Sequence, residues 1–359
     1  MWRTDQFQYN ALPSRVVFGR GSLASLADAV KQLGAHRALV LCTPQQQGQA
    51  EVAAKLLGPA CVGVHPGAQM HVPIESAREA REVAQQLGAD CAVALGGGST
   101  IGLGKAIALE SALPIVAVPT TYAGSEMTPI YGITADGLKK TGRDARVLPK
   151  TVIYDPELTD GLPLDMSITS GINAIAHAAE GLYAQDGNPV MAMMAEEGIR
   201  ALADGLRGLR RHGSLHMASR DASLYGAWLC GAVLGHVGMA LHHKLCHTLG
   251  GTLNLAHAPT HTVVLPHALA YNRAAAPDAM IRISRALGAT DAPTGLFDLA
   301  SELGAPLSLR EIGMQEADIE RAAQTAIANP YWNPRPIDLE GLRRLLRDAW
   351  DGRRPERPN

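Results

Sequence analysis

In the first 160 residues, short apolar segments alternate with longer stretches of helical periodicity. The segments typical of strands are His36–Cys42, Cys61–His65, Asp90–Leu95, Leu113–Val118 and Val152–Tyr154, and those typical of helices are Glu51–Leu57, Pro73–Leu87 and Thr100–Glu110. Strands that alternate with helices of this length are joined by crossover connections, which produce a parallel sheet. The first half of the chain is therefore predicted to form an α/β domain built on a parallel sheet.

The pattern changes near residue 160. From Ser167 onward, apolar residues recur at helical spacing and strand-like runs nearly disappear. We expect long helices at Met191–Leu209, Ser219–His236 and Met239–Leu249, the last of them ended by Gly250-Gly251, because paired glycines suit a helix C-terminus. The chain is therefore predicted to have two domains, an α/β domain over residues 1–160 and an all-α domain over residues 161–359.

Charge and cysteine content exclude several classes of protein. A net charge of -2 over 359 residues argues against nucleic acid or an anionic membrane as partner. The N-terminus lacks the apolar run of a signal peptide, and the apolar stretches are much shorter than the ~20 residues of a membrane helix. Five scattered cysteines without a CxxC pair indicate a reducing, cytoplasmic compartment. The charged fraction of 18% is below the usual ~25%, which favours a homo-oligomer.

A glycine-rich segment, Gly96-Gly97-Gly98-Ser99, stands between a predicted strand and a predicted helix. Glycine allows a backbone to approach a ligand closely, and the start of the following helix presents free N–H groups to an anion. This arrangement can hold a pyrophosphate at the carboxyl end of a parallel sheet, although a tight strand–helix turn uses glycine as well. The spacing is not GxGxxG, so the usual dinucleotide fingerprint is absent.

Hydroxyl side chains follow two other predicted strands. Thr120, Thr121 and Ser125 come after one strand, and Thr43 comes after the strand that ends at Cys42. Taken alone, such residues are typical of turns and caps, but here they share one sheet edge with the glycine-rich segment, which predicts that NADH or NADPH is bound. No acidic residue follows Cys42 as far as Gln47. We therefore expect no strict exclusion of the 2′-phosphate of NADPH.

Histidine is concentrated in one stretch, since seven of the 13 histidines fall between His236 and His267. His243 and His247 are four residues apart and so face one side of a helix, and Asn173 and His177 have the same spacing in a segment typical of a helix start. Imidazoles at such spacing can bind a metal or transfer protons. The histidines interpreted as functional are His177, His243, His247 and His257, and those interpreted as structural are His212, His216, His242, His261 and His267.

Five segments between about Ala11 and Arg335 carry a family resemblance. They are GGGSTIGLGKA, PTTYAGSEMTPI, GINAIAHAAEGLYA, HHKLCHTLGGTLNLAHAPTH and NPYWNPRPI. Together they resemble the iron-containing alcohol dehydrogenase superfamily and, within it, the maleylacetate reductase branch. The resemblance implies a dehydroquinate synthase-like fold with a Rossmann-like domain, an all-α domain, an active site in the cleft between them, and a homodimer. It also implies reduction of the enone double bond of maleylacetate to 3-oxoadipate by NADH or NADPH, late in the degradation of aromatic compounds.

The resemblance also bears on metal binding. Metal-dependent relatives hold their ion with one aspartate and three histidines, and the matching positions here are Asn173, His177, His243 and His257. These relatives also carry an aspartate in the glycine-loop helix, where this chain has Gly102. An amide is a poorer ligand than a carboxylate for a divalent cation, so we expect that no metal is required. If an ion does bind, His177, His243 and His257 are expected to hold it.

The expected reaction needs a group that stabilises negative charge, because hydride transfer to the enone produces an enolate. We expect His243 and His257, with His177, to donate hydrogen bonds or a proton in place of a Lewis acid, and His247 to be a second proton donor. A small dicarboxylate is the expected partner, and cationic side chains can bind its carboxylates. The residues predicted to contact the substrate are Lys244, Arg335 and Asn173; for Lys244 and Arg335 a solvated surface position is the alternative.

Three other functions remain open from the sequence. A metal-dependent alcohol or polyol dehydrogenase on the same scaffold is disfavoured by Asn173 and Gly102. A lyase such as the related dehydroquinate synthase depends on its metal ligands and is disfavoured by Asn173 as well. A catalytically inactive nucleotide-binding protein would keep the glycine-rich segment but would have no need of the histidine set.

Overall fold

The computed structural model describes residues 7–12, 14–135, 138–328 and 330–356. The chain divides into two compact units, one over Ala11–Leu162 and the other formed by Pro163 and the residues after it together with the segment before Ala11. The division falls two residues beyond the expected boundary. Residues 7–10 belong with the second unit rather than with the first, and the Tyr9 ring stacks on His236 with ring centroids 5.6 Å apart.

The first unit contains the parallel sheet that the sequence predicts. Its six strands are β1 (Arg15–Phe18), β2 (Ala38–Leu41), β3 (Cys61–His65), β4 (Cys91–Gly96), β5 (Ile115–Pro119) and β8 (Thr151–Tyr154), in the order β1-β8-β5-β4-β2-β3. All paired neighbours in this sheet run parallel. The α/β prediction for this half of the chain is confirmed, and the carboxyl ends of β2, β4 and β5 lie next to one another at one sheet edge.

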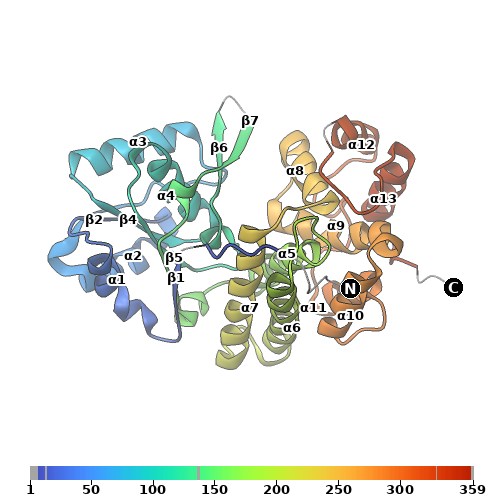
Figure 1. Ribbon diagram of the computed structural model, residues 1–359, viewed down its shortest axis with the longest axis horizontal. Coiled ribbons are helices and arrows are strands. Elements are labelled where there is room, and N and C mark those ends of the chain that lie inside the picture. Colours follow the sequence, from blue (N-terminus) through green and yellow to red (C-terminus); the bar gives the residue numbers. More distant parts are fainter. Residues whose placement is uncertain (1–6, 13, 136–137, 329, 357–359) are drawn as a thin grey trace. The chain divides into compact units, whose positions relative to one another are not determined.

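Helices cover both faces of this sheet (Figure 1). Helices α1 (Leu26–Gln32) and α2 (Gln47–Leu57) pack on one face against Val40, Val93 and Val116, and helices α3 (Ile74–Gln86) and α4 (Gly98–Ser111) pack on the other against Leu39, Leu41 and Ala92. Successive side chains of a strand point to opposite faces, so a strand buried on both sides is apolar at every position. This explains why the sequence of β2, Ala38–Leu41, contains no polar residue.

Three elements of the first unit are not among those predicted. They are β1, α1 and the antiparallel hairpin of β6 (Ile130–Ala135) and β7 (Leu138–Arg143), which forms a separate two-stranded sheet. β6 is only partly buried, and β7 is rich in basic residues. Neither strand therefore has the continuous apolar run by which the buried parallel strands are recognised.

The described residues of the second unit form helices and the loops that connect them, without a strand. Its helices are α5 (Leu164–Gly181), α6 (Pro189–His212), α7 (Met217–His236), α8 (Leu241–Leu253), α9 (His257–Asn272), α10 (Pro277–Leu287), α11 (Ala292–Leu303), α12 (Asp318–Ala328) and α13 (Leu339–Asp351). Glycines let α6 and α7 approach closely, because a Cβ at Gly226 would lie 2.8 Å from the carbonyl oxygen of Gly198. The all-α prediction for this half of the chain is confirmed.

Two local predictions for this unit were wrong. Helix α8 continues through Gly250 and Gly251 and ends only at Leu253, before Asn254 in the left-handed region at φ 53°. The helix is long enough for the glycines to be tolerated, and Asn254 provides the positive φ at its end. Asn173 and His177 do not mark a helix start either, because α5 begins at Leu164 and both residues lie in its buried interior.

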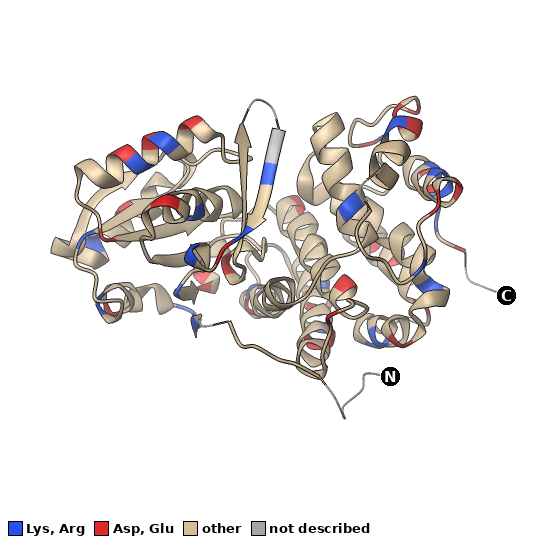
Figure 2. Ribbon diagram, turned by 45° about the horizontal axis from the view of Figure 1, so that its top comes forward, with Lys and Arg blue, Asp and Glu red and all other residues tan. Residues whose placement is uncertain are grey.

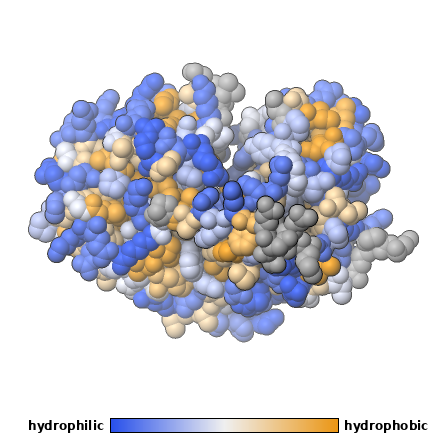
Figure 3. All heavy atoms as spheres, viewed as in Figure 1, coloured by the Kyte–Doolittle hydropathy of each residue, from blue (hydrophilic) through white to orange (hydrophobic). Residues whose placement is uncertain are grey.

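On helix α3 the charged side chains lie away from the buried face. On α3 the buried positions are Ser76, Ala77, Ala80 and Ala84, and the acidic and basic residues between them form alternating colours along the ribbon (Figure 2). On the face shown in Figure 3, apolar residues are interspersed with hydrophilic ones. Among the described residues, no single helix has both the length and the apolar content of a membrane span; α7 and α8 reach them only as a pair, across a 94° bend. All five cysteines are unpaired.

Candidate active site

The predicted cofactor residues meet at the carboxyl ends of β2, β4 and β5. The backbone N–H of Thr120 donates to the carbonyl of Gly96 at 3.1 Å, and a Cβ at Gly97 would lie 3.0 Å from Cγ2 of Thr121. The Gln46 side chain donates to Oγ1 of Thr120 at 2.7 Å, and its Oε1 lies 3.2 Å from Oγ1 of Thr43. The glycine-rich segment, the threonine pair and Thr43 therefore share one sheet edge.

Glycine is required at the start of this site. Gly96 has φ +154°, and a Cβ there would collide with the Thr100 hydroxyl. Gly97 is the N-cap of α4 and supplies no side-chain cap, so the N–H groups of Gly98 and Ser99 belong to the first helical turn, where no intrahelical acceptor exists. The backbone therefore presents donors and a positive helix end to an anion such as a pyrophosphate.

A buried lysine connects the two loops of this edge. Lys105 of α4 is fully buried, and its Nζ lies 2.6, 2.8 and 2.7 Å from the carbonyl oxygens of Ser125, Thr128 and Ile130. Burial lowers the pKa of Lys105 to about 7, yet three carbonyl acceptors match the three donors of an ammonium group. The glycine-loop helix thus holds the segment that contains Ser125 in a fixed position.

The helical unit contains a cluster of six histidines: His177 on α5, His242, His243 and His247 on α8, and His257 and His261 on α9. The ring centroid of His243 lies 5.2 Å from that of His177, 4.9 Å from that of His261 and 6.2 Å from that of His247. The ring centroids of His257 and His261 are 4.2 Å apart. All four histidines interpreted as functional are therefore brought together. His242 and His261, interpreted above as structural, lie inside the same cluster.

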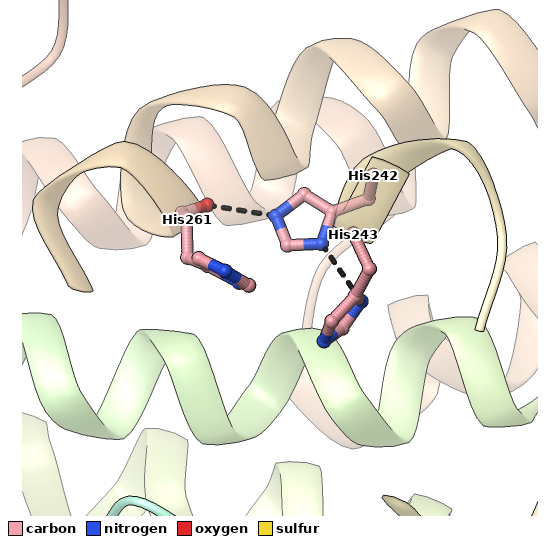
Figure 4. Close-up of side chains that lie close together, drawn as sticks. All are labelled: His242, His243 and His261. Carbon is pink, nitrogen blue, oxygen red and sulfur yellow. Dashed lines mark hydrogen bonds between the residues drawn. The ribbon is translucent and has the colours of Figure 1, made fainter. Parts of the chain in front are cut away.

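Figure 4 shows the buried centre of this cluster. The ring nitrogen atoms of His242, His243 and His261 come within 4.8 Å of one another. Nε2 of His242 lies 3.0 Å from the carbonyl oxygen of His261, and its Nδ1 lies 3.3 Å from Nδ1 of His243. This trio shares only His243 with the metal set that the resemblance implies. The sequence signal for His261 was its spacing of four residues from His257 on one helix.

Burial keeps the inner histidines uncharged. Burial lowers the pKa of His242 to about 3, and burial, with the neighbouring imidazoles as a further cause, holds the pKa values of His177, His243 and His261 well below their usual range. Nδ1 of His177, Nε2 of His243 and both ring nitrogens of His261 are buried and have no hydrogen-bond partner in the protein. A buried polar atom without a partner is costly, so these atoms indicate a place where a ligand binds.

Glu180 is a member of the site that the sequence analysis lacks. It is fully buried on α5, and its Oε2 lies 2.7 Å from Nδ1 of His243. Burial raises its pKa, whereas His242 and three backbone N–H groups act in the opposite direction. The signal was present, because Asn173, His177 and Glu180 have the spacing i, i+4, i+7 and so lie along one helix face.

The remaining predicted residues lie at the margin of the cluster or outside it. Asn173 is buried, and its Oδ1 has no partner. His247 is exposed, and its Nδ1 lies 3.1 Å from the hydroxyl of Tyr331. Nζ of Lys244 lies over the ring of the same tyrosine, 5.5 Å from the ring centroid. Tyr331 is thus a further residue beside the site, contributed by the late NPYWNPRPI segment.

Arg335 has other contacts. Its guanidinium lies 3.9 Å from the ring centroid of Tyr271, and Nη1 donates to the carbonyl of the same residue. It lines a cavity of about 580 Å³ together with Arg344, Arg353 and Arg354, and none of the six clustered histidines lines that cavity. Buried His267 lines it as well, whereas His212 and His216 pair near the turn between α6 and α7, with ring centroids 4.8 Å apart.

Comparison with known proteins agrees with this arrangement. The family model described as iron-containing alcohol dehydrogenase matches residues 13–156, and the model of the C-terminal part of the Fe-containing alcohol dehydrogenase family matches residues 167–350. The chain belongs to the iron-containing alcohol dehydrogenase family.

Several members of this family are closely similar to the chain over its full length. Maleylacetate reductase of Burkholderia cepacia is 63% identical over 351 residues, which cover 98% of this chain and 99% of that protein. Maleylacetate reductase of Sphingobium indicum is 56% identical over 350 residues, with coverage of 98% and 99%. The crystal structure of maleylacetate reductase from Agrobacterium tumefaciens superposes with a TM-score of 0.95 at 52% identity, covering 98% of this chain and 100% of that one.

The donor set decides how well a divalent cation fits. Buried neutral imidazoles are good ligands for zinc or iron, and His242, His243 and His261 are close enough to share an ion. The oxygens of Glu180 already accept hydrogen bonds from backbone and imidazole N–H groups, and Asn173 offers an amide oxygen. An ion would therefore be held by neutral ligands only, with no carboxylate free to offset its charge.

Proposed function

We propose that this protein reduces maleylacetate to 3-oxoadipate with a hydride from NADH or NADPH. The observation that carries the proposal is the group of buried, uncharged histidines, His177, His242, His243 and His261, together with buried Asn173, at the position where metal-dependent relatives have an aspartate. The similarity of the whole chain to maleylacetate reductases, at 63% and 56% sequence identity, supports the same reaction. The cofactor is assigned to the edge formed by Gly96, Gly97 and Thr120.

The reaction adds one hydride and one proton to a conjugated double bond. When bound, the reduced nicotinamide would supply the hydride, which the alkene carbon remote from the ketone would receive. The carbon–carbon π electrons would then move toward the ketone to form an enolate. The enolate then takes up a proton at the adjacent carbon, which completes the saturated product.

The histidines are proposed to stabilise the enolate. Neutral imidazoles offer N–H donors in a site shielded from water, where a hydrogen bond to a developing oxyanion is strong. His177, which is buried, is proposed as such a donor, and exposed His257 as a further donor at the margin of the cluster. His243, expected from the sequence to be a donor, has a lone pair on Nε2 when its Nδ1–H is donated to Glu180, so it is proposed to take up a proton at Nε2 and to pass that proton to the enolate carbon. Exposed His247 can exchange protons with solvent and is proposed to resupply the cluster.

Substrate recognition is proposed to use positive charge near the cluster. Lys244 lies between two of the site histidines in sequence and stands over Tyr331, so its ammonium group is available to one carboxylate of the substrate. Asn173 can accept or donate a hydrogen bond inside the cluster. Arg335 is proposed to bind the second carboxylate of the substrate. To do so its guanidinium would have to leave its contacts with Tyr271 and Asp338.

We also propose that turnover does not require a metal ion. If an ion binds, the histidines hold it, and it supplies Lewis-acid stabilisation of the substrate oxygen. The alternative function, a metal-dependent alcohol or polyol dehydrogenase, is favoured by one observation, the spacing of His242, His243 and His261. The loss of the carboxylate ligand at Asn173 weighs against it, because a neutral ligand set binds a divalent cation less tightly.

One experiment distinguishes a metal-independent maleylacetate reductase from a metal-dependent alcohol dehydrogenase. NADH oxidation is measured for chelator-treated protein with freshly prepared maleylacetate, with and without added Fe²⁺ or Zn²⁺, and a simple alcohol is tested in the reverse direction. Turnover of maleylacetate that is insensitive to chelation supports the proposal. Activity on alcohols that appears only with added metal would overturn it.

The setting of the reaction is also a proposal. We infer that the protein works in the cytoplasm as a homodimer and consumes the product of an aromatic-ring-cleaving route. The unpaired cysteines and the low content of charged residues support this proposal. Light scattering coupled to gel filtration tests the dimer, with a monomeric mass as the contrary result.

A further inference from the structure

Every acceptor position of the Glu180 carboxylate is in use. Oε2 accepts from the backbone N–H of Ala240 at 2.8 Å and of His243 at 3.4 Å, and Oε1 accepts from the backbone N–H of His242 at 2.8 Å and from the hydroxyl of Tyr183 at 3.3 Å. The fifth partner is Nδ1 of His243, at 2.7 Å from Oε2. A backbone N–H can only donate, so the carboxylate is an acceptor at both oxygens.

These contacts replace an ordinary helix cap. The N-cap of α8 is Ala240, which has no side chain able to accept a hydrogen bond. Glu180, on α5, accepts instead from the N–H of the N-cap residue Ala240 and from those of His242 and His243 in the first turn of α8, and Asn333 accepts the N–H of Leu241 at 3.4 Å. An anion at a helix N-terminus is favourable because of the helix dipole. The carboxylate therefore fixes where α8 begins relative to α5, within one compact unit.

The same carboxylate fixes the tautomer of His243. Because Oε2 is an acceptor, Nδ1 of His243 must carry the hydrogen, and the neutral ring then has its lone pair on Nε2. Nε2 is the buried atom without a partner in the protein. The ring is also held in place beside His177 and His261, at centroid distances of 5.2 and 4.9 Å.

We propose that Glu180 is a positioning residue for the reaction: it determines that Nε2 of His243 faces the reactants with a lone pair, and it holds the start of α8 against α5. The proposal rests on the catalytic role of His243 given above. Glu180 itself contacts neither substrate nor cofactor. Partners that orient a functional histidine in this way typically contribute about 10- to 100-fold to activity.

The test compares Glu180→Ala with Glu180→Gln. The amide of Glu180→Gln can keep its oxygen at the Oε2 position, where it still accepts from His243. Its NH₂ group can donate to Tyr183 but cannot accept the N–H of His242, so one hydrogen bond is lost. We therefore expect kcat to fall by about 10- to 100-fold in Glu180→Ala, with partial recovery in Glu180→Gln. The KM for NADH is expected to stay unchanged in both, because the cofactor residues lie in the other unit. Loss of NADH affinity together with kcat would indicate general unfolding and would contradict the proposal.

A second readout does not depend on activity. In ¹⁵N-histidine-labelled protein, with signals assigned by their loss in His243→Gln, the ¹⁵N shifts report which ring nitrogen carries hydrogen. We expect Nδ1–H in the wild type and in Glu180→Gln, and a mixture of tautomers in Glu180→Ala. Glu126→Gln, which changes another fully buried carboxylate, is the control and is expected to leave the His243 signals unchanged. Nε2–H in the wild type, or Nδ1–H retained in full in Glu180→Ala, would overturn the proposal. Because this readout needs no substrate, it remains informative if maleylacetate is not reduced.

Discussion

A Cβ at position 102 would lie 2.6 Å from Cγ2 of Val72, so Gly102 and Val72 share a space that has no room for a larger residue. Val72 is buried and has φ +51°, a backbone conformation that is rare for a β-branched side chain. The resemblance implies an aspartate at position 102 in the metal-dependent relatives. In this chain the corresponding place is filled by Val72.

Gly102→Asp is therefore expected to destabilise the protein by about 1–3 kcal/mol through overpacking, as measured by urea unfolding. Val72→Gly in the Gly102→Asp background removes the obstructing methyl group, and glycine adopts the positive φ at this position without steric strain. The double variant is expected to be more stable than Gly102→Asp alone. Additive effects of the two substitutions would show that the residues do not compete for space.

Asn173→Asp is expected to create a metal site at the cost of stability without metal. The Oδ1 of Asn173 is buried and has no partner, so a carboxylate there would be an unpaired buried charge. We expect the unfolding temperature to fall in chelator and to recover with Zn²⁺, and calorimetry to detect tighter Zn²⁺ binding than in the wild type. Asn173→Ala is the control, for which added Zn²⁺ should give no recovery. Equal Zn²⁺ affinity in Asn173→Asp and the wild type would contradict the prediction.

The histidine cluster predicts loss of stability in mild acid. The pKa of His242 in the folded protein is about 3, and those of His177, His243 and His261 are well below the usual range. Below about pH 6.5 the unfolded chain takes up protons at these residues and the folded protein does not, so the free energy of unfolding falls as pH falls. The slope is up to about 1.4 kcal/mol per pH unit for each histidine.

Urea unfolding between pH 7 and 5 measures this slope, in a range where most carboxylates remain ionised. His242→Gln is expected to make the pH dependence of the free energy of unfolding shallower by about one proton. A free energy of unfolding that does not vary between pH 7 and 5 would show that the cluster is protonated in the folded state.

Gly96→Ala is expected to weaken cofactor binding. A methyl group at this position would collide with the Thr100 hydroxyl at the first turn of α4, where the anion is expected to bind. We expect the Kd for NADH, measured by fluorescence titration, to rise about tenfold or more, which corresponds to about 1.4 kcal/mol. Gly48→Ala is the matched control, because a Cβ at Gly48 meets no atom within 4 Å. Unchanged NADH affinity in Gly96→Ala would remove this loop from the cofactor site.

The sequence predicts best what is determined locally. Buried parallel strands such as Cys91–Gly96 are continuous apolar runs, and the helices between them have clear periodicity, so the order of elements follows from the pattern alone. Strand β6, which begins the hairpin at Ile130, has no such pattern, because it is only partly buried and is stabilised by pairing with β7. Gly250-Gly251 were misleading because the end of a helix depends on which residue adopts a positive φ, here Asn254.

The site was predictable only in part for a similar reason. His177 and His243 could be selected by spacing along their own helices, but their neighbours His242 and His261 meet only when α8 packs on α9. Glu180 has its partners some 60 residues further along the chain. The spacing of Glu180 from His177 placed it on the same helix face as the site, but a single sequence gives no indication of which distant N–H groups it accepts.

The contacts of Lys105 have a consequence for how the cofactor arrives. An ammonium group cannot leave water until the carbonyls of Ser125, Thr128 and Ile130 surround it, so this loop takes its shape as the α/β unit folds. The conformational entropy of the loop is then lost at folding and not at binding. Association with the dinucleotide consequently involves little ordering of the chain, and its rate is expected to be set by diffusion and orientation rather than by loop closure.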